Sequence, residues 1–179
     1  KDELSCYYID QNMLSFGCAW NSCKMCGSKA EGLCEHIPRD FDMVIREDEE
    51  LALMGSRKIH HICSCAYIDD FIPFYIKWNL SPILVHVEHR GSEILKRAEN
   101  IYDVIQDSCY SIEYGMEHGS DHMLQVLNKS HKSVAEIKEH IELISNYDKM
   151  LYRFYIILGH PAETEDDLKQ LLDLFGFIT

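Results

Sequence analysis

The sequence has no apolar run of about 18 residues, the shortest that usually crosses a bilayer as a helix. It also has no charged start followed by an apolar signal core. Internal repeats and low-complexity linkers are absent as well. We therefore expect no membrane span and no secretory signal, and we predict a cytoplasmic protein.

Basic residues are scarce: 17 Lys and Arg stand against 30 Asp and Glu, and the formal net charge is −13. Because nucleic-acid affinity depends largely on Lys and Arg contacts to phosphates, this balance disfavours a nucleic-acid partner. The 179 residues, 46% of them hydrophobic, are enough for one globular domain with a substantial core. We therefore expect residues 1–179 to form a single domain.

The eight cysteines are not spread as a disulfide framework would be, since such frameworks are typical of smaller secreted domains. Three of them, Cys18, Cys23 and Cys26, fall within nine residues, with four and two residues between them. Thiolates this close together can hold one metal centre, and they select zinc, copper(I) or an iron–sulfur cluster. The others, which are Cys6, Cys34, Cys63, Cys65 and Cys109, are interpreted as free thiols of a reducing compartment.

Three ligands leave alternatives open, because zinc and ordinary clusters normally take four. A four-iron cluster with three thiolates would leave one iron open for a small molecule with an amine and a carboxylate. A two-iron cluster of the plant ferredoxin type shares the C-x4-C-x2-C spacing and would take a distant fourth cysteine: Cys34, Cys63, Cys65 or Cys109. A structural zinc site would be completed by Cys34 or His36.

Predicted strands and helices alternate along the chain, which indicates an α/β fold with a parallel sheet and outer helices. A short first strand is expected within residues 1–17, after a lead-in, and further strands in residues 59–67, 83–89, 109–114 and 151–158. Helices are expected over 41–54 and 71–80, and after the N-caps Ser92, Ser120, Ser133 and Thr164. The acidic run 47–50 is expected to be a solvated face, and Leu168, Leu171, Leu172 and Phe175 to share one face of the last helix.

Polar residues follow or line several of the strands. Alternation places His86 and Glu88 on one strand face, and likewise Cys109, Ser111 and Glu113, with the apolar neighbours on the other face. We expect the polar faces, together with Arg153 and Tyr155, to line the interior of a barrel. His118 and His122 are expected on a solvated turn and helix face rather than as metal ligands.

Four stretches resemble motifs of the radical S-adenosylmethionine enzyme superfamily. GCAWNSCKMC resembles a Gly-Cys-x-Trp-Asn-x-Cys-x-x-Cys cluster loop found in its cobalamin-associated branch, one residue longer than the usual C-x3-C-x2-C. IEYGMEHGSD resembles a Gly-x-Glu-Ser-Gly-Ser-Asp turn with His118 in place of serine, and YIILGHPAET resembles an Ile-x-Gly-x-Pro-x-Glu-Thr turn. VEHRGSEIL resembles an arginine-bearing turn. A ferredoxin or a zinc module predicts none of the last three.

The resemblance implies a partial (β/α)6 radical barrel, cut after its fifth strand–helix unit, so that residues 1–179 would be a piece of a longer chain. It implies a 4Fe-4S cluster on Cys18, Cys23 and Cys26, and S-adenosylmethionine cleaved there to a 5'-deoxyadenosyl radical. The implied cofactor contacts are Met25, in place of the usual aromatic residue, and Glu88, Arg90, Glu117 and Gly159.

The same resemblance raises cobalamin as a further cofactor, a small-molecule or peptide substrate, and an external electron donor such as a flavodoxin or ferredoxin. The reaction would be radical methylation or another peptide or small-molecule modification. Two alternatives remain open at this point: an acidic electron-transfer protein with a four-ligand cluster, and a zinc-stabilised binding module.

Overall fold

The structure is a computed structural model that describes residues 10–18, 20, 22–27, 36–56, 58–62, 84–89, 102–103, 105–107, 109–129 and 133–178. For residues 84–89 and Tyr110 it describes the backbone alone. The helix expected over 71–80 and most of the helix expected after Ser92 lie outside these residues. Among the described helices, none is long and apolar enough to cross a membrane.

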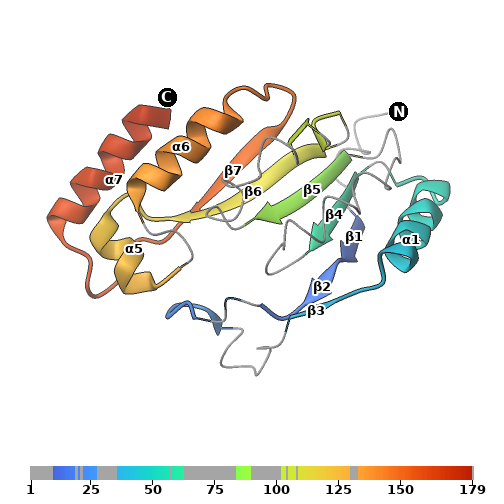
Figure 1. Ribbon diagram of the computed structural model, residues 1–179, viewed down its shortest axis with the longest axis horizontal. Coiled ribbons are helices and arrows are strands. Elements are labelled where there is room, and N and C mark those ends of the chain that lie inside the picture. The colour runs from blue at the N-terminus through green and yellow to red at the C-terminus, as the bar shows by residue number, and fades with distance from the viewer. Residues whose placement is uncertain are drawn as a thin grey trace.

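Five strands form one parallel sheet, in the order β1-β4-β5-β6-β7 (Figure 1). They are β1 (Asp10–Met13), β4 (Lys58–Ile62), β5 (Leu84–His89), β6 (Cys109–Glu117) and β7 (Leu151–Ile156). Neighbours in the sheet follow one another along the chain, as repeated strand–helix–strand units require. The expected α/β fold with a partial parallel barrel is confirmed.

A second, two-stranded ribbon pairs β2 (Ser15–Phe16) with β3 (Ile37–Pro38) in antiparallel fashion. The sequence predicted an irregular link around Pro38, and this short strand corrects it. Proline is tolerated there because a two-residue edge strand needs few amide donors. The ribbon brackets the cysteine-rich segment, which lies between its two strands in the chain.

The described helices are α1 (Phe41–Leu53), α5 (Asp121–Leu127), α6 (Val134–Ile144) and α7 (Glu165–Ile178). In Figure 1, α6 and α7 run beside β6 and β7, and α1 lies beside β1 and β4. Three of the predicted caps are confirmed: Ser120 Oγ accepts from the Met123 amide, Ser133 Oγ from the Glu136 amide, and Thr164 Oγ1 from the Asp167 amide. The fourth, Ser92, lies outside the described residues.

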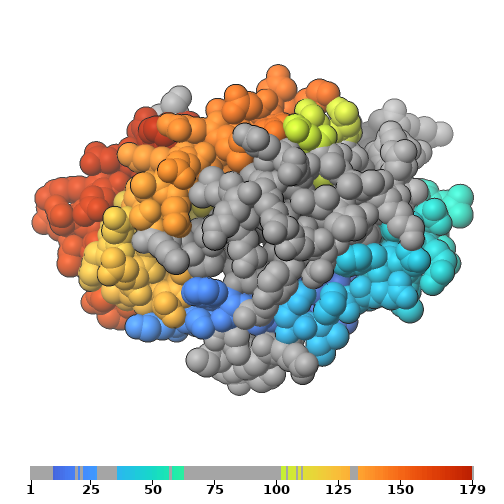
Figure 2. Space-filling model, viewed as in Figure 1, coloured from blue at the N-terminus to red at the C-terminus, as the bar shows by residue number. Residues whose placement is uncertain are grey.

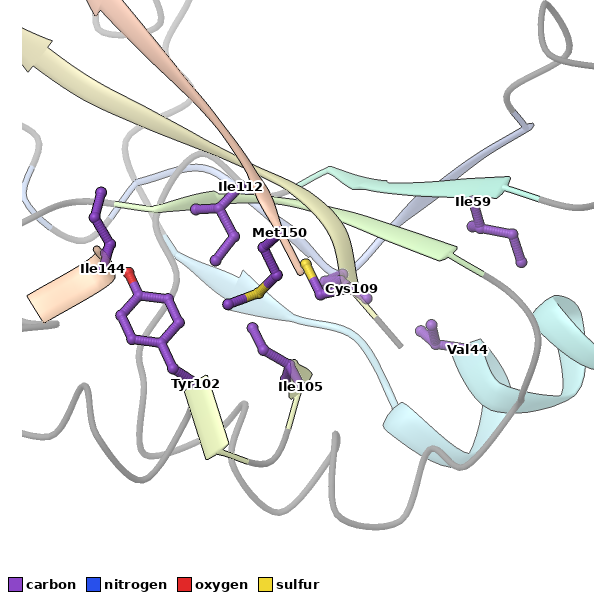
Figure 3. Close-up of a cluster of buried hydrophobic side chains, with 9 residues drawn as sticks. Val44, Ile59, Tyr102, Ile105, Cys109, Ile112, Ile144 and Met150 are labelled. Atoms are coloured by element: carbon purple, nitrogen blue, oxygen red, sulfur yellow. The ribbon is translucent and has the colours of Figure 1, made fainter. Parts of the chain in front are cut away.

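The helices cover the apolar face of the sheet. One buried cluster gathers Tyr102, Ile105, Cys109, Ile112 and Met150 with Val44 and Ile59 (Figure 3). A second cluster packs Tyr114 and Met116 of β6 against α5, α6 and α7, through Leu124, Ile137, Ile141, Leu171 and Leu174. The opposite face of β6 carries Ser111 and Glu113, so the polar side chains point away from the helices.

A register shift in β6 corrects the expected face of Cys109. Val85 pairs with Cys109, but His86 pairs with Ser111, so one residue of β6 is extra at this point. Such a bulge reverses the alternation, and Cys109 therefore joins Ile112 in the core instead of sharing a face with Ser111. Burial raises the pKa of the Cys109 thiol to about 12.

Two helix faces also differ from expectation. Leu172 is 65% exposed, while Leu171 and Leu174 are buried, so the apolar stripe of α7 is narrower than the leucine pattern indicated. In α1 the acidic run is not wholly solvated. Asp48 is fully buried and accepts hydrogen bonds from Asn12 at 2.8 Å and from His61 at 2.8 Å.

Candidate cofactor site

The cysteine-rich segment, residues 18–27, follows β1 and β2 at the carboxyl end of the sheet, and we call it the cluster loop. Cys18 and Cys23 are partly buried and Cys26 is exposed. Ligands of parallel α/β folds bind at this edge of the sheet. The loop therefore presents its thiols at the position where the fold places its chemistry.

The donor set fits a cluster better than a single ion. In the described part of the chain, no three His, Cys, Asp or Glu side chains are grouped so that they could hold a metal ion. Zinc requires its thiolates to meet at one point, about 2.3 Å from the ion. In an iron–sulfur cluster each cysteine binds its own iron, so the thiols need not meet. Three thiols on one loop, two partly buried and one exposed, are compatible with the second requirement.

Cys109 is excluded as a fourth ligand. It lies at the first residue of β6, the opposite edge of the parallel sheet from the cluster loop, and its side chain is 3% exposed within the core (Figure 3). Cys34, Cys63 and Cys65, the other candidates, lie outside the described residues, as does Cys6.

The cluster loop is attached to the C-terminal end of α5, about a hundred residues later in the chain. The Lys24 amide donates to the Leu127 carbonyl at 3.0 Å, and the Trp20 indole Nε1 donates to the Asn128 carbonyl at 2.9 Å. In return, Asn128 Nδ2 donates to the Ser22 carbonyl at 2.8 Å. Figure 2 shows the loop in blue lying against α5 in gold.

Glu117, the predicted cofactor contact at the end of β6, lies on a bulge. Gly115 pairs with Tyr155 and Glu117 with Ile156, so Met116 is extra, and Glu117 takes a left-handed backbone with φ of 66°. A non-glycine residue rarely adopts this conformation, and such strain gathers at functional sites. The Glu117 side chain, 6% exposed, forms an ion pair with Lys129 Nζ.

The ion pair of Glu117 and Lys129 explains why position 115 is a glycine. A Cβ added to Gly115 would collide with both Lys129 Nζ and Glu117 Oε1. Lys129 therefore lies over the backbone of β6, just after α5, with its charge beside the predicted cofactor-binding carboxylate. The sequence alone did not single out this lysine.

The turns after β6 and β7 are joined by a histidine and a glutamate. His118 Nε2 lies 3.1 Å from Glu163 Oε1, and Glu163 Oε2 accepts the Gly159 amide at 3.0 Å. His118 is fully buried, so the expected solvated turn is wrong: its side chain spans to the next turn. Gly159 has φ of 77°, which glycine adopts without strain.

A second set of hydrogen bonds joins the start of α5 to the start of α7. The buried carboxylate of Asp167, at the start of α7, accepts from Ser120 Oγ at the start of α5 and lies 3.0 Å from His122 Nδ1. Gly119 fits between the two helices, since its added Cβ would lie 2.6 Å from Leu171 Cα. Side-chain hydrogen bonds therefore join the turns that end β6 and β7.

The predicted interior residues fall into register across the sheet. Glu88 pairs with Glu113 and Glu113 with Arg153, so the three lie in one row on the same face. Arg153 Nη1 donates to Glu113 Oε1 at 3.2 Å, and the Glu113 carboxylate is buried. The side chain of Glu88 and all of Arg90 lie outside the described residues, and Met25 lies half-buried in the cluster loop.

No family model matches the chain. Its sequence is similar to ribosomal protein uS12 methylthiotransferases named RimO: 30% identical to that of Clostridioides difficile over 93% of this chain, and 25% identical to that of Thermosipho africanus over 78%. Together with the fold and the cysteine motif, these relatives decide the assignment. The chain belongs to the radical S-adenosylmethionine superfamily.

Solved structures of the superfamily share the fold. The radical S-adenosylmethionine methyltransferase TsrM from Kitasatospora setae, with cobalamin and a [4Fe-4S] cluster bound, superposes with a TM-score of 0.81 over 95% of this chain at 17% identity. The cobalamin-dependent radical enzyme OxsB with aqua-cobalamin bound gives 0.77 over 91% at 15% identity.

The chain spans about two fifths or less of those proteins: 39% and 35% of the two RimO sequences, 34% of TsrM and 26% of OxsB. The ligands and substrates of those longer proteins are therefore not assigned to this chain. The predictions for the single domain 1–179, cobalamin and the electron donor stay predictions.

Sequence reasoning missed Lys129 and Asn128, whose contacts to Glu117 and Ser22 no local motif reveals. It included Glu163 in the YIILGHPAET turn, but not the contact of Glu163 with His118. One signal was available: Asn128 follows the apolar run 123–127, and asparagine after such a run is typical of a helix C-cap.

Proposed function

We propose that this chain is the cofactor-cleaving core of a radical S-adenosylmethionine enzyme, with a 4Fe-4S cluster held by Cys18, Cys23 and Cys26. The observation that carries the proposal is the position of the three-thiol loop at the carboxyl edge of a parallel sheet, bonded to the helix that follows the Glu117 turn. When bound, the reduced cluster supplies the electron that splits a carbon–sulfur bond of S-adenosylmethionine, giving the 5'-deoxyadenosyl radical.

The protein's part in this chemistry is to bind and orient. Glu117 is poised to accept hydrogen bonds from ribose hydroxyls or an ammonium group, because its carboxylate is buried and acceptor-only. Lys129, beside it, offers a cation to a carboxylate. Gly159 leaves the backbone bare where a ligand can approach closely, whereas the space beside Gly115 is taken by Lys129 and Glu117. Arg90 and Glu88 remain predicted contacts of the same cofactor.

The polar row of Glu113, which is buried, and Arg153, which is exposed, supports a substrate placed on the interior face of the sheet. The Arg153 guanidinium pairs with the buried Glu113 carboxylate, so that carboxylate is not left as an uncompensated buried charge. The relatives act through methylthio or methyl transfer according to their names, and we infer a reaction of this kind on a small molecule or a peptide. An external flavodoxin or ferredoxin would supply the electron, and cobalamin is a further cofactor in this proposal.

The experiment is anaerobic reconstitution with iron and sulfide, followed by reduction with dithionite in the presence of S-adenosylmethionine. We expect about four irons per chain, an electron paramagnetic resonance spectrum that S-adenosylmethionine shifts, and release of 5'-deoxyadenosine. A cluster whose spectrum ignores S-adenosylmethionine would identify an electron carrier instead, and one zinc per colourless chain would identify a structural module.

Paired alanine variants test the ligand assignment. Cys23→Ala should abolish the brown cluster, because a ligand is lost, whereas Cys34→Ala should keep the wild-type iron content and spectrum. Iron and sulfide analysis with visible spectra measures both. Loss of the cluster in Cys34→Ala would show that the polypeptide supplies a fourth ligand, and the open iron would be disproved.

A further inference from the structure

The contact between the cluster loop and α5 is built around one residue, Asn128. Its backbone is left-handed, with φ of 50° and ψ of 42°, and its amide closes the last turn of α5 on the Leu124 and Gln125 carbonyls. Asparagine is one of the few residues other than glycine that adopt this conformation readily. The helix therefore stops at a defined point and leaves its final carbonyls to other partners.

Those final carbonyls are used by the cluster loop. The last carbonyls of a helix have no partner within it. Leu127 and Asn128 give theirs to the Lys24 amide and the Trp20 indole, and the Asn128 side chain donates back to the Ser22 carbonyl. The three bonds involve residues on both sides of Cys23 in the sequence.

The other end of α5 is fixed to the predicted cofactor-binding turn. Ser120 caps the helix and donates to the buried Asp167, directly after Glu117, His118 and Gly119. Seven residues of helix separate the two ends, a length of about 10 Å. The residue after Asn128 is Lys129, whose ammonium group forms an ion pair with Glu117. Helix α5 thus connects the cluster loop, at its C-terminal end, to the turn that contains Glu117, at its N-terminal end.

We propose that Asn128 is a positioning residue, which holds the cluster loop at a fixed distance from Glu117 so that one S-adenosylmethionine can reach both. This inference rests on the proposed function for what the loop binds. The contact between Asn128 and the cluster loop exists without any cofactor. The proposal can therefore be tested independently in the apo protein and in the protein reconstituted with a cluster.

The test compares Asn128→Asp with Asn146→Asp. Aspartate keeps the size and the tolerance for the left-handed backbone, but it replaces the Nδ2 donor with an oxygen that faces the Ser22 carbonyl. Asn146 is the matched control, because its Nδ2 donates at 3.1 Å and 3.0 Å to the last carbonyls of α6, away from the cluster loop. Both variants add one negative charge near a helix C-terminus.

In the apo protein, the readout is hydrogen exchange of the Lys24 amide. We expect it to exchange about tenfold faster in Asn128→Asp, and at the wild-type rate in Asn146→Asp. Trp20→Phe, which removes only the indole donor from the loop side, should accelerate the same amide and guards against a folding defect in the first variant. An unchanged Lys24 rate in both Asn128→Asp and Trp20→Phe would overturn the proposal.

In the reconstituted protein, the readouts are the paramagnetic spectrum and the rate of bleaching by a chelator. Asn128→Asp should take up iron normally, bleach about tenfold faster than Asn146→Asp, and show a smaller spectral shift with S-adenosylmethionine. Bleaching and spectral shift equal to the control would overturn the proposal. The wild-type protein could fail to take up a cluster while the Lys24 amide still exchanges faster in Asn128→Asp and Trp20→Phe. That result would refute the proposed function and support Asn128 as the residue that positions the loop.

Discussion

At the scale of single residues, the buried carboxylate of Asp167 collects four donors from two helix starts. They are Ser120 Oγ, His122 Nδ1 at 3.0 Å, and the amide and hydroxyl of Thr164 at 2.9 Å and 2.7 Å. Burial by itself raises the pKa of Asp167, but the hydrogen bonds from Ser120, Thr164 and His122 outweigh it and hold the pKa well below the ordinary 3.8. The ionised form is therefore the one that the fold stabilises.

Asp167→Asn should lower the free energy of unfolding at pH 7 by about 2 kcal/mol, because an amide nitrogen would face one of these donors. A depressed folded pKa gives stability that is present above the unfolded pKa of 3.8 and lost as the pH falls below it. The gap between wild type and variant should therefore shrink between pH 4 and about pH 2. Urea titrations at pH 7, 4 and 3 measure it, and a gap independent of pH would contradict the assigned charge.

Sequence reasoning reached part of this residue-level picture. The Thr164 and Asp167 capping pair was predictable, because its members are three residues apart and the motif is local. The bonds from Ser120 and His122 were not, since they join residues 45 or more positions apart. His118 failed for the same reason: its partner Glu163 lies in the next turn of the sheet.

At the scale of elements, α1 is anchored to the sheet by a buried charge that amphipathic patterning treated as solvated. Asp48 accepts from Asn12 on β1 and from His61 on β4, both buried. The neighbouring Glu47 pairs with Arg39 at 2.6 Å, and the hydrogen bond from Arg39 lowers its pKa. Arg39 also donates to the Met13 carbonyl at 3.0 Å, at the residue where β1 leads toward the cluster loop.

Asp48→Ala should lower the free energy of unfolding by about 3–5 kcal/mol, because it removes a buried charge that accepts from two buried side chains. Glu49→Ala, one residue away on the exposed face of α1, should change it by about 0.5 kcal/mol or less. Chemical denaturation of both variants measures the difference. Equal small effects would mean that the Asp48 network adds nothing to the attachment of α1.

Element boundaries followed from local signals, but the bulges in β6 did not. Capping residues predicted the starts of α5, α6 and α7, and the apolar runs predicted β5, β6 and β7 to within a few residues. The extra residues near Tyr110 and at Met116 depend on how β6 meets its neighbours, which alternation along one strand does not reveal. These bulges decide the side on which Cys109 lies and the strained backbone of Glu117.

At the scale of the whole molecule, the order of strands was predictable, whereas the contacts that assemble the site were not. Alternating strands and helices allow few topologies, and the parallel order across the sheet is one of them. The proposed site, however, draws Cys23 from the first turn, Glu117 and Lys129 from either end of α5, and Gly159 from the turn after β7. Cys23, Glu117 and Gly159 were found in motifs and Lys129 was not, and the mutual positions of all four come only from packing.

This separation implies that cluster assembly and S-adenosylmethionine binding are separable. Glu117→Gln leaves the cluster loop untouched, so its iron content should equal that of the wild type. The dissociation constant for S-adenosylmethionine should rise about tenfold, since hydrogen bonds from the cofactor to a charged acceptor would be weakened. Glu142→Gln, exposed on α6, is the control. Titration of the spectral shift with S-adenosylmethionine measures the dissociation constant for the wild type and both variants. An unchanged dissociation constant in Glu117→Gln would mean that the ion pair of Glu117 and Lys129 is only a structural contact. Loss of iron would mean that the turn after β6 holds the cluster loop more directly than α5 does.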